Sequence, residues 1–287
     1  MMPPDGQTQV VLLLGHPVRH SQSPRIHNAA FVAQGINAVY VACEVDEGSL
    51  ADAVRGMRAL RCWGANVTIP HKQAVVPLMD EVSVEAEAVG AVNTIVRLPD
   101  GQLRGDNTDA AGFLDPLERR YGDALEGASA LVLGAGGAAR AVVYALLTRY
   151  AVRRCTIAAR RAAQAEALRE AMTLYDSSGG LRTTTFADAA DAMPQHRLIV
   201  NATPVGMTPD TEARPVPAAG WASGHIAYDL VYTPRTTRFL RDADAAGADT
   251  VGGIEMLIGQ AAAAYHQWTD RTMPLDVVRA ALNASRS

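Results

Sequence analysis

The feature that most constrains the fold is a glycine-rich turn between an apolar run and a helical segment. Residues 130–133 are apolar and predict a buried strand, and residues 134–139 follow as Gly-Ala-Gly-Gly-Ala-Ala. The spacing of Gly134, Gly136 and Ala139 matches the G-x-G-x-x-G/A fingerprint of dinucleotide-binding folds. Gly134 permits the tight turn, Gly136 lets the backbone approach a pyrophosphate, and Ala139 keeps helix and strand close. The pattern predicts a helix N-terminus that faces cofactor phosphates.

Strand and helix signals also alternate along the first hundred residues. Strands are predicted at residues 10–14 and 37–45, and a helix at residues 50–60. Ser23 followed by Pro24 predicts a helix start with Ser23 as the N-cap. This alternation favours a mostly parallel sheet covered by helices.

A second alternating series begins near residue 129, and the chain ends in helices. We therefore expect an α/β protein with two lobes, an N-terminal α/β substrate domain and a Rossmann-type dinucleotide-binding domain, with a cleft between them. The expected domains are residues 1–108 plus 254–287 and residues 109–253. The predicted strands of the second series are residues 130–133, 155–158, 198–201 and 226–230, and the predicted helices are residues 138–149, 161–174, 254–268 and 275–283.

Composition excludes several classes of protein. Of the 287 residues, 48% are hydrophobic and 20% charged, which is ordinary for a globular protein with a substantial core. The net charge of -4 argues against nucleic acid or an anionic membrane as a partner. The apolar run at residues 10–14 follows no basic segment and is too short for a signal peptide or membrane span. The three cysteines are scattered, which indicates a reducing compartment, and we expect a cytoplasmic protein. We expect it to be a monomer or a homodimer, a choice that the sequence does not fix.

The end of the strand after the glycine turn predicts the cofactor. NAD sites carry a carboxylate there, whereas residues 153–164 contain no acid. Arg160 and Arg161 stand in its place, and a guanidinium pairs well with a 2′-phosphate. NADP is therefore predicted over NAD. The alternatives are that both arginines only begin an exposed helix and that the glycine turn holds no ligand.

Hydroxyl and amide side chains gather at several predicted element ends. Ser21 and Ser23 lie at a helix start, where hydroxyls and a helix N-terminus together make a good carboxylate receptor. Asn93 and Thr94 lie at a strand start, and Gln260 lies on an apolar helix. Each of these residues taken alone is as consistent with a structural role as with a functional one.

Two polar loops supply a lysine and an aspartate. The first, residues 66–72, reads Asn-Val-Thr-Ile-Pro-His-Lys and ends in Lys72. The second, residues 105–109, reads Gly-Asp-Asn-Thr-Asp and ends in Asp109. Both residues lie among hydrogen-bonding side chains and outside the glycine-rich nucleotide motif. No metal site is expected, because the histidines lack an H-E-x-x-H pattern.

The order of these motifs resembles the shikimate dehydrogenase family over roughly residues 10–270. The resemblance implies reversible hydride transfer between NADPH and 3-dehydroshikimate, a step of aromatic amino acid biosynthesis. It is carried by His-Ser-x-Ser-Pro at 20–24, Gly-Ala-Asn-Val-Thr-Ile-Pro-x-Lys at 64–72, Gly-Ala-Val-Asn-Thr at 90–94, Gly-Asp-Asn-Thr-Asp at 105–109, Gly-Ala-Gly-Gly-Ala at 134–138, Asn-Ala-Thr-Pro-x-Gly-Met at 201–207, Tyr-Asp-Leu-Val-Tyr at 228–232 and Gly-Ile-Glu-Met-Leu at 253–257.

The resemblance also implies a role for each matching position. Lys72 would transfer the proton, with Asp109 as its partner. The residues implied to bind the substrate, a ring carboxylic acid, are Ser21 and Ser23 for the carboxylate, Thr68, Asn93, Asp109 and Gln260 for the ring hydroxyls, Asn66 in support, and Tyr232 beside the nicotinamide. The residues implied to bind NADP are Gly134, Ala135, Gly136, Gly137, Ala138, Arg160, Leu230 and Gly253.

Three positions depart from the family pattern and keep alternatives open. Ala110 follows Asp109 where glycine is usual, and residues 159–161 read Ala-Arg-Arg rather than Asn-Arg-Thr. Glu255 stands where the biosynthetic enzymes often carry glycine, which leaves room for a quinate/shikimate dehydrogenase of broader specificity. Further alternatives are a non-catalytic dinucleotide-binding sensor and a methylenetetrahydrofolate-type dehydrogenase, although the latter does not explain the paired serines.

Overall fold

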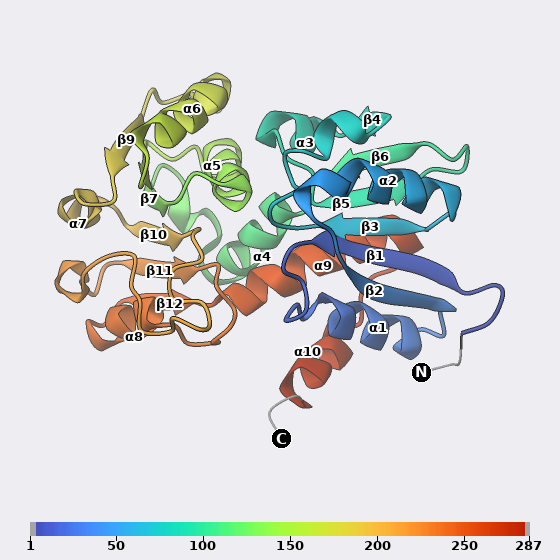
Figure 1. Ribbon diagram of the computed structural model, residues 1–287. Coiled ribbons are helices and arrows are strands. Elements are labelled where there is room, and N and C mark those ends of the chain that lie inside the picture. The colour runs from blue at the N-terminus through green and yellow to red at the C-terminus, as the bar shows by residue number, and fades with distance from the viewer. Residues whose placement is uncertain (1–3, 285–287) are drawn as a thin grey trace. The chain divides into compact units, whose positions relative to one another are not determined.

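The computed structural model describes residues 4–284 and divides the chain into two compact units (Figure 1). The first unit consists of the residues up to Thr108 together with those from Gln260 onward, and the second unit is Asp109–Gly259. The chain returns to the first unit within one helix, α9 (Gly253–Thr269). Among the described residues, no helix is both long and apolar enough to cross a membrane. The expectation about a signal peptide falls partly on residues 1–3, which lie outside the described range.

The first unit is built on a six-stranded sheet with the strand order β2-β1-β3-β5-β6-β4. The predicted strands near the N-terminus and at residues 37–45 are both present. The bounds of the six strands are β1 Gln9–Gly15, β2 Ala38–Glu44, β3 Gly64–Val67, β4 Glu81–Val82, β5 Thr94–Arg97 and β6 Leu103–Asp106.

The sheet of this unit is mostly parallel, as predicted, but it is mixed because one strand is reversed. Strand β5 runs antiparallel to both β3 and β6. A tight turn causes the reversal: the N–H of Leu98 donates to the carbonyl of Gln102 at 2.8 Å, and Gly101 has φ +91°. Residues 99–101 of this turn read Pro-Asp-Gly, a sequence that is typical of hairpin turns.

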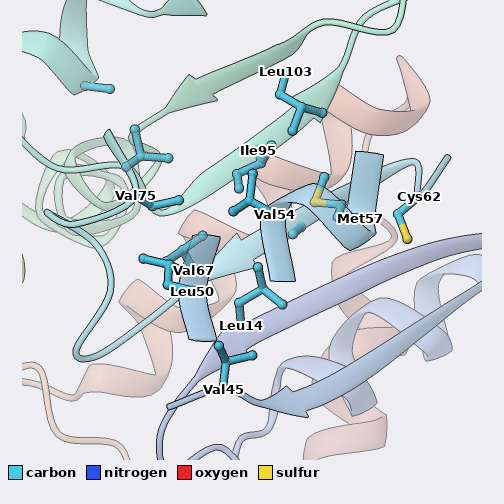
Figure 2. Close-up of a cluster of buried hydrophobic side chains, with 13 residues drawn as sticks. Leu14, Val45, Leu50, Val54, Met57, Cys62, Val67, Val75, Ile95 and Leu103 are labelled. Atoms are coloured by element: carbon cyan, nitrogen blue, oxygen red, sulfur yellow. The ribbon is translucent and has the colours of Figure 1, made fainter. Parts of the chain in front are cut away.

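Helix α2 covers one face of this sheet with an apolar stripe. Leu50, Val54 and Met57 recur at helical spacing and point from α2 toward the strands, where Leu14 and Ile95 meet them (Figure 2). All five side chains are buried. The helices of the unit, with α9 shared, are α1 Ser23–Ala33, α2 Leu50–Ala59, α3 Val84–Val89 and α10 Leu275–Asn283.

The second unit contains an all-parallel sheet with the order β12-β11-β10-β7-β8-β9. This is the strand order of the Rossmann fold, in which the chain starts at the centre and builds outward on both sides. The predicted α/β class is confirmed. The bounds of the strands are β7 Ser129–Leu133, β8 Arg154–Ala159, β9 Leu181–Thr185, β10 Leu198–Asn201, β11 Ile226–Asp229 and β12 Asp249–Val251.

Two of these strands were not predicted, and both lie at the edges of the sheet. Strand β9 reads Leu-Arg-Thr-Thr-Thr and is largely exposed, so it lacks an apolar pattern. Strand β12 has only three residues. The helices of the unit are α4 Asp109–Tyr121, α5 Gly137–Arg149, α6 Ala162–Met172, α7 Ala189–Ala192 and α8 Arg238–Ala245, together with the start of α9.

Candidate functional site

The glycine-rich turn lies at the switch point of the Rossmann sheet, where the strand order reverses between β7 and β10. Gly134 has φ +121°, which favours glycine, and its N–H donates to the carbonyl of Ala158 at 2.7 Å. A Cβ on Gly134 would lie 2.9 Å from the carbonyl oxygen of Ala202. The turn therefore requires glycine both for its conformation and for the close approach of the chain after β10.

The next residues of the turn leave room for a ligand. Gly136 is exposed, and a Cβ built on it would meet no atom within 4 Å. It is the N-cap of α5 and, being glycine, has no side chain that could cap the first N–H groups of that helix. Ala139 is fully buried and packs the helix on the sheet. Between them Gly137 and Ala138 are half-buried, as is Ala135.

Arg160 and Arg161 follow directly on β8 and are both exposed. Within the part of the chain that the structure describes, neither forms an ion pair. Arg161 is the N-cap of α6 in an extended conformation. The two guanidinium groups thus lie beyond the carboxyl end of the strand where a dinucleotide ribose binds in Rossmann folds.

Leu230 and Tyr232 follow β11, and both are half-buried. Gly253 begins α9 and is buried, and a Cβ on it would lie 2.4 Å from the carbonyl oxygen of Leu230. No side chain larger than glycine fits there without moving the backbone after β11. The structure therefore brings Leu230 and Gly253 together, while their common role at the nicotinamide stays a prediction.

Sequence reasoning missed one buried acid of this unit. Asp229 is the last residue of β11 and is fully buried, and its burial raises the pKa of the carboxyl to about 6. The hydrogen bonds that it accepts from Thr237, Val231 and Asn201 act in the opposite direction on this pKa. The sequence contains a signal for it, because Asp229 is the only acid in the apolar run at residues 226–231, where a strand is expected to be buried.

In the first unit, a buried amide-hydroxyl network lies at the ends of β3, β5 and β6. Asn66 Oδ1 accepts from the hydroxyl of Tyr40 at 2.8 Å, while its Nδ2 donates to the carbonyl of Asn93 and to Thr94 Oγ1, both at 3.1 Å. Asn93 Oδ1 in turn accepts the N–H of Thr108 at 2.8 Å. Asn66 therefore has its polar atoms satisfied within the protein, which fits its predicted supporting role.

Thr68 differs from that network. Its N–H donates to the carbonyl of Leu14 at 2.9 Å, but its hydroxyl has no hydrogen-bond partner among residues 4–284. Its methyl group packs so closely on Gly15 that a Cβ there would lie 2.3 Å away. The packing on Gly15 and the backbone hydrogen bond to Leu14 fix the position of Thr68, and its role as a substrate ligand stays a prediction.

Ser21 and Ser23 lie together at the start of α1, but the predicted cap is wrong. The N-cap is Gln22, which makes no side-chain capping bond, and Ser23 is the first helical residue. Ser21 Oγ accepts the N–H of Ser23 at 3.2 Å. Helix α1 begins one residue earlier than predicted, and the side chain that accepts a local backbone N–H there is Ser21 rather than Ser23. The hydroxyl of Ser23 has no partner within the described part of the chain.

Lys72 is half-buried in the turn that follows β3, and its carbonyl accepts the N–H of Val92 at 2.8 Å. This bond places the backbone of Lys72 beside Asn93. Asp109 is buried and was predicted on a loop, whereas it is the first residue of α4 and of the second unit. Gln260 lies on α9 as predicted and is 9% exposed. No group of three or more potential metal ligands occurs in residues 4–284.

Comparison with known proteins identifies the family. Residues 13–95 match the shikimate dehydrogenase substrate binding domain, and residues 253–282 match the shikimate 5'-dehydrogenase C-terminal domain. A relative from Salinibacter ruber named shikimate dehydrogenase (NADP(+)) is 59% identical over 285 residues, which cover 99% of this chain and 100% of the relative.

Solved structures agree with this relationship. A shikimate dehydrogenase in complex with NADP+ has a TM-score of 0.93 at 35% identity, covering 99% of this chain and 98% of that one. A quinate dehydrogenase from Corynebacterium glutamicum in complex with NAD has a TM-score of 0.88 at 30% identity, covering 96% of this chain and 99% of that one. The similarity extends over the whole chain and both units, and the protein belongs to the shikimate dehydrogenase family.

Proposed function

We propose that this protein catalyses the reversible oxidation of shikimate to 3-dehydroshikimate with NADP, in the cytoplasm, as a step of aromatic amino acid biosynthesis. The assignment of shikimate as the substrate rests on the full-length similarity to the Salinibacter ruber relative. The hydroxyls of Ser23 and Thr68 support it, since they have no partner among the described residues and suit a polyhydroxylated ring acid. The protein acts as a monomer or a homodimer, with no nucleic acid or membrane partner.

The second unit fits NADP on its own observations. Gly136 has open space around it at a helix N-terminus, where phosphate groups are well stabilised. Arg160 is exposed and unpaired among the described residues, so its guanidinium can bind a 2′-phosphate. When bound, NADP supplies the hydride acceptor. Its ligands would be Gly134, Ala135, Gly136, Gly137, Ala138, Arg160, Leu230 and Gly253, so residues 109–253 form the NADP-binding domain.

We propose that residues 1–108 plus 254–287 bind the substrate. Ser21 and Ser23 would bind the carboxylate at the start of α1, where the helix dipole favours an anion. Asn66 holds the backbone carbonyl of Asn93 and needs no direct contact with the substrate. The proposed ligands of the ring hydroxyls are Thr68, Asn93, Asp109 and Gln260, with Tyr232 at the nicotinamide side.

Lys72 is the proposed proton-transfer residue, with Asp109 as its partner. Lys72 is the only lysine in the chain: lysine and arginine total 26, and the other 25 are arginines. An arginine remains protonated at every relevant pH, whereas a lysine can give up a proton and recover it. Lys72 is therefore the only Lys or Arg side chain in the sequence that can act as both acid and base in the reaction.

A quinate/shikimate dehydrogenase is the second candidate function. The likeness to a quinate dehydrogenase in complex with NAD favours it, since that protein matches nearly the whole chain. The two candidates differ in substrate and in cofactor, so one experiment separates them.

The test is the initial rate of nicotinamide reduction, with shikimate or quinate crossed against NADP or NAD. Turnover that is fast only with shikimate and NADP supports the proposal. A preference for quinate or NAD would transfer the protein to the second candidate function. NADP binding without turnover for any pair would instead favour a non-catalytic sensor.

A further inference from the structure

A buried carboxylate that the proposed reaction does not use ties together three segments of the Rossmann unit. Asp229 Oδ1 accepts from Asn201 Nδ2 at 2.9 Å and from the N–H of Val231 at 3.0 Å. Its Oδ2 accepts the hydroxyl hydrogen of Thr237. One side chain thereby joins the end of β10, the segment after β11 and the start of α8.

Asn201 extends this link into the segment after β10. Its Nδ2 also donates to the carbonyl of Val205 at 3.1 Å, and its Oδ1 accepts from the N–H of Thr203 at 3.1 Å and from its hydroxyl at 2.6 Å. The backbone carbonyl of Asn201 accepts the N–H of Leu230 at 2.9 Å. Both polar atoms of the buried Asn201 side chain are hydrogen-bonded. These bonds fix the conformation of residues 201–205 and their position beside β11.

Thr237 needs Asp229 as an acceptor. Thr237 is fully buried and is the N-cap of α8, where its Oγ1 accepts the N–H of Leu240 at 3.3 Å. A hydroxyl has a single hydrogen, and here that hydrogen goes to Asp229. Removing the carboxylate would leave three donors without an acceptor in a buried place, those of Thr237, Asn201 and Val231.

The linked segments lie at one edge of the sheet. Because β7, β10 and β11 are parallel, their carboxyl ends share this edge with the glycine turn. Residues 201–205 approach Gly134 there, with the carbonyl of Ala202 2.9 Å from a hypothetical Cβ. Dinucleotides bind at this edge in Rossmann folds, at the switch point between the two halves of the sheet.

We propose that Asp229 is a positioning residue for the nicotinamide end of NADP, acting through the segments 201–205 and 230–232 that it holds together. The inference rests on the proposed function. It assigns to Asp229 an effect chiefly on the cofactor and a smaller one on the ring acid through Tyr232, because the segments it fixes belong to the cofactor-binding unit.

The test compares Asp229→Ala with Asp229→Asn in steady-state kinetics and in NADPH binding followed by nicotinamide fluorescence. Loss of the acceptor should lower kcat/KM for NADP by about a hundredfold in Asp229→Ala, as expected when a reacting group is displaced by about 1 Å. The KM for shikimate at saturating NADP should change much less than the KM for NADP. Asp229→Asn keeps an oxygen for Asn201 and Val231 and should lose less than about tenfold.

Thr237 supplies an independent pair of variants in case Asp229→Ala fails to fold. Thr237→Val removes the donor and the helix cap together, whereas Thr237→Ser keeps both. The serine variant should restore the KM for NADP that the valine variant raises.

Asp176→Asn is the matched control. Asp176 also holds a loop, by accepting the N–H groups of Gly180 at 3.1 Å and Leu181 at 2.9 Å, but it lies before the amino end of β9. This variant should lose stability without any change in the KM for NADP.

The outcomes separate the inference from the proposed function. A wild-type protein that binds NADPH but does not oxidise shikimate would overturn the proposed function, and NADPH affinity across the variants would still test the inference. Wild-type NADPH affinity and kinetics in Asp229→Ala would overturn the inference, as would an equal change in the KM for shikimate or the same cofactor defect in Asp176→Asn.

Discussion

Arg119 on α4 donates to Glu255 on α9, with Nη2 and Oε2 3.1 Å apart, so the acid that departs from the family pattern contacts a helix of its own unit. The same guanidinium also pairs with Asp115 at 2.7 Å. Glu255 lies in the first turn of α9, where a negative charge stabilises the helix. These contacts give Glu255 a structural role that needs no change of substrate.

We predict that Glu255→Gly destabilises the protein by about 1–2 kcal/mol, since it adds a helix glycine and removes a partly exposed ion pair. Thermal unfolding measures this loss, and Glu255→Gln is the control that removes only the charge. The ratio of quinate to shikimate turnover should not change in either variant. A large change in that ratio would assign Glu255 to specificity.

Lys72→Ala should reduce kcat by about 10²–10⁴-fold, because the reaction loses its proton donor. The KM for shikimate should change comparatively little, as the hydroxyl and carboxylate ligands remain. Initial rates with shikimate and NADP measure both. Since the chain has no other lysine, an amine-reactive label can modify only the Lys72 side chain and the N-terminus. Protection of Lys72 from the label can therefore be measured at a single side chain. Near-normal turnover in Lys72→Ala would remove Lys72 from the mechanism.

Arg160→Ser should raise the KM for NADP by about ten- to a hundredfold, the loss of one charge-assisted hydrogen-bond pair to a phosphate. The KM for NAD should be unaffected, because NAD lacks the 2′-phosphate. The matched control is Arg153→Ser, an exposed arginine just before the opposite end of the same strand. An equal effect of both variants would indicate a general effect of charge rather than a phosphate site.

The buried carboxyl of Asp229 should make stability depend on pH. Its pKa is raised from 3.8 to about 6 by burial, so between these values the native protein binds a proton that the unfolded chain does not. This group therefore stabilises the fold below about pH 4, and that contribution is lost as the pH rises through about 6. The gap corresponds to about 3 kcal/mol.

Urea unfolding of the wild type and of Asp229→Asn between pH 4 and pH 7 tests this. As the pH falls, the free energy of unfolding of the wild type should increase relative to that of Asp229→Asn. His196 and His225, whose pKa values are lowered mainly by burial, are present in both proteins, so their titration cancels in the difference. A difference that stays constant with pH would contradict the raised pKa.

Structural features that are built from adjacent residues could be predicted from the sequence alone. The turn at residues 134–139 needs only its own glycines and the strand before it, so its place at the start of α5 was predictable. Family motifs of this kind identified the family as well. Even a local feature was predicted one residue off, since the N-cap of α1 is Gln22 and not Ser23. The hydroxyl of Ser21 accepts the N–H of Ser23 there.

Only the tertiary structure decided how distant polar groups are satisfied. Tyr40 binds Asn66 across 26 positions, and Asn201 binds Asp229 across 28. Neither pairing follows from spacing, because each depends on the order in which the strands lie in the sheet. The sequence by itself determined the chemical groups and the local turns. The tertiary structure determined which of those groups are hydrogen-bonded inside the protein and which, like the hydroxyl of Thr68, have no partner among residues 4–284, because a hydrogen bond requires its partner within about 3 Å.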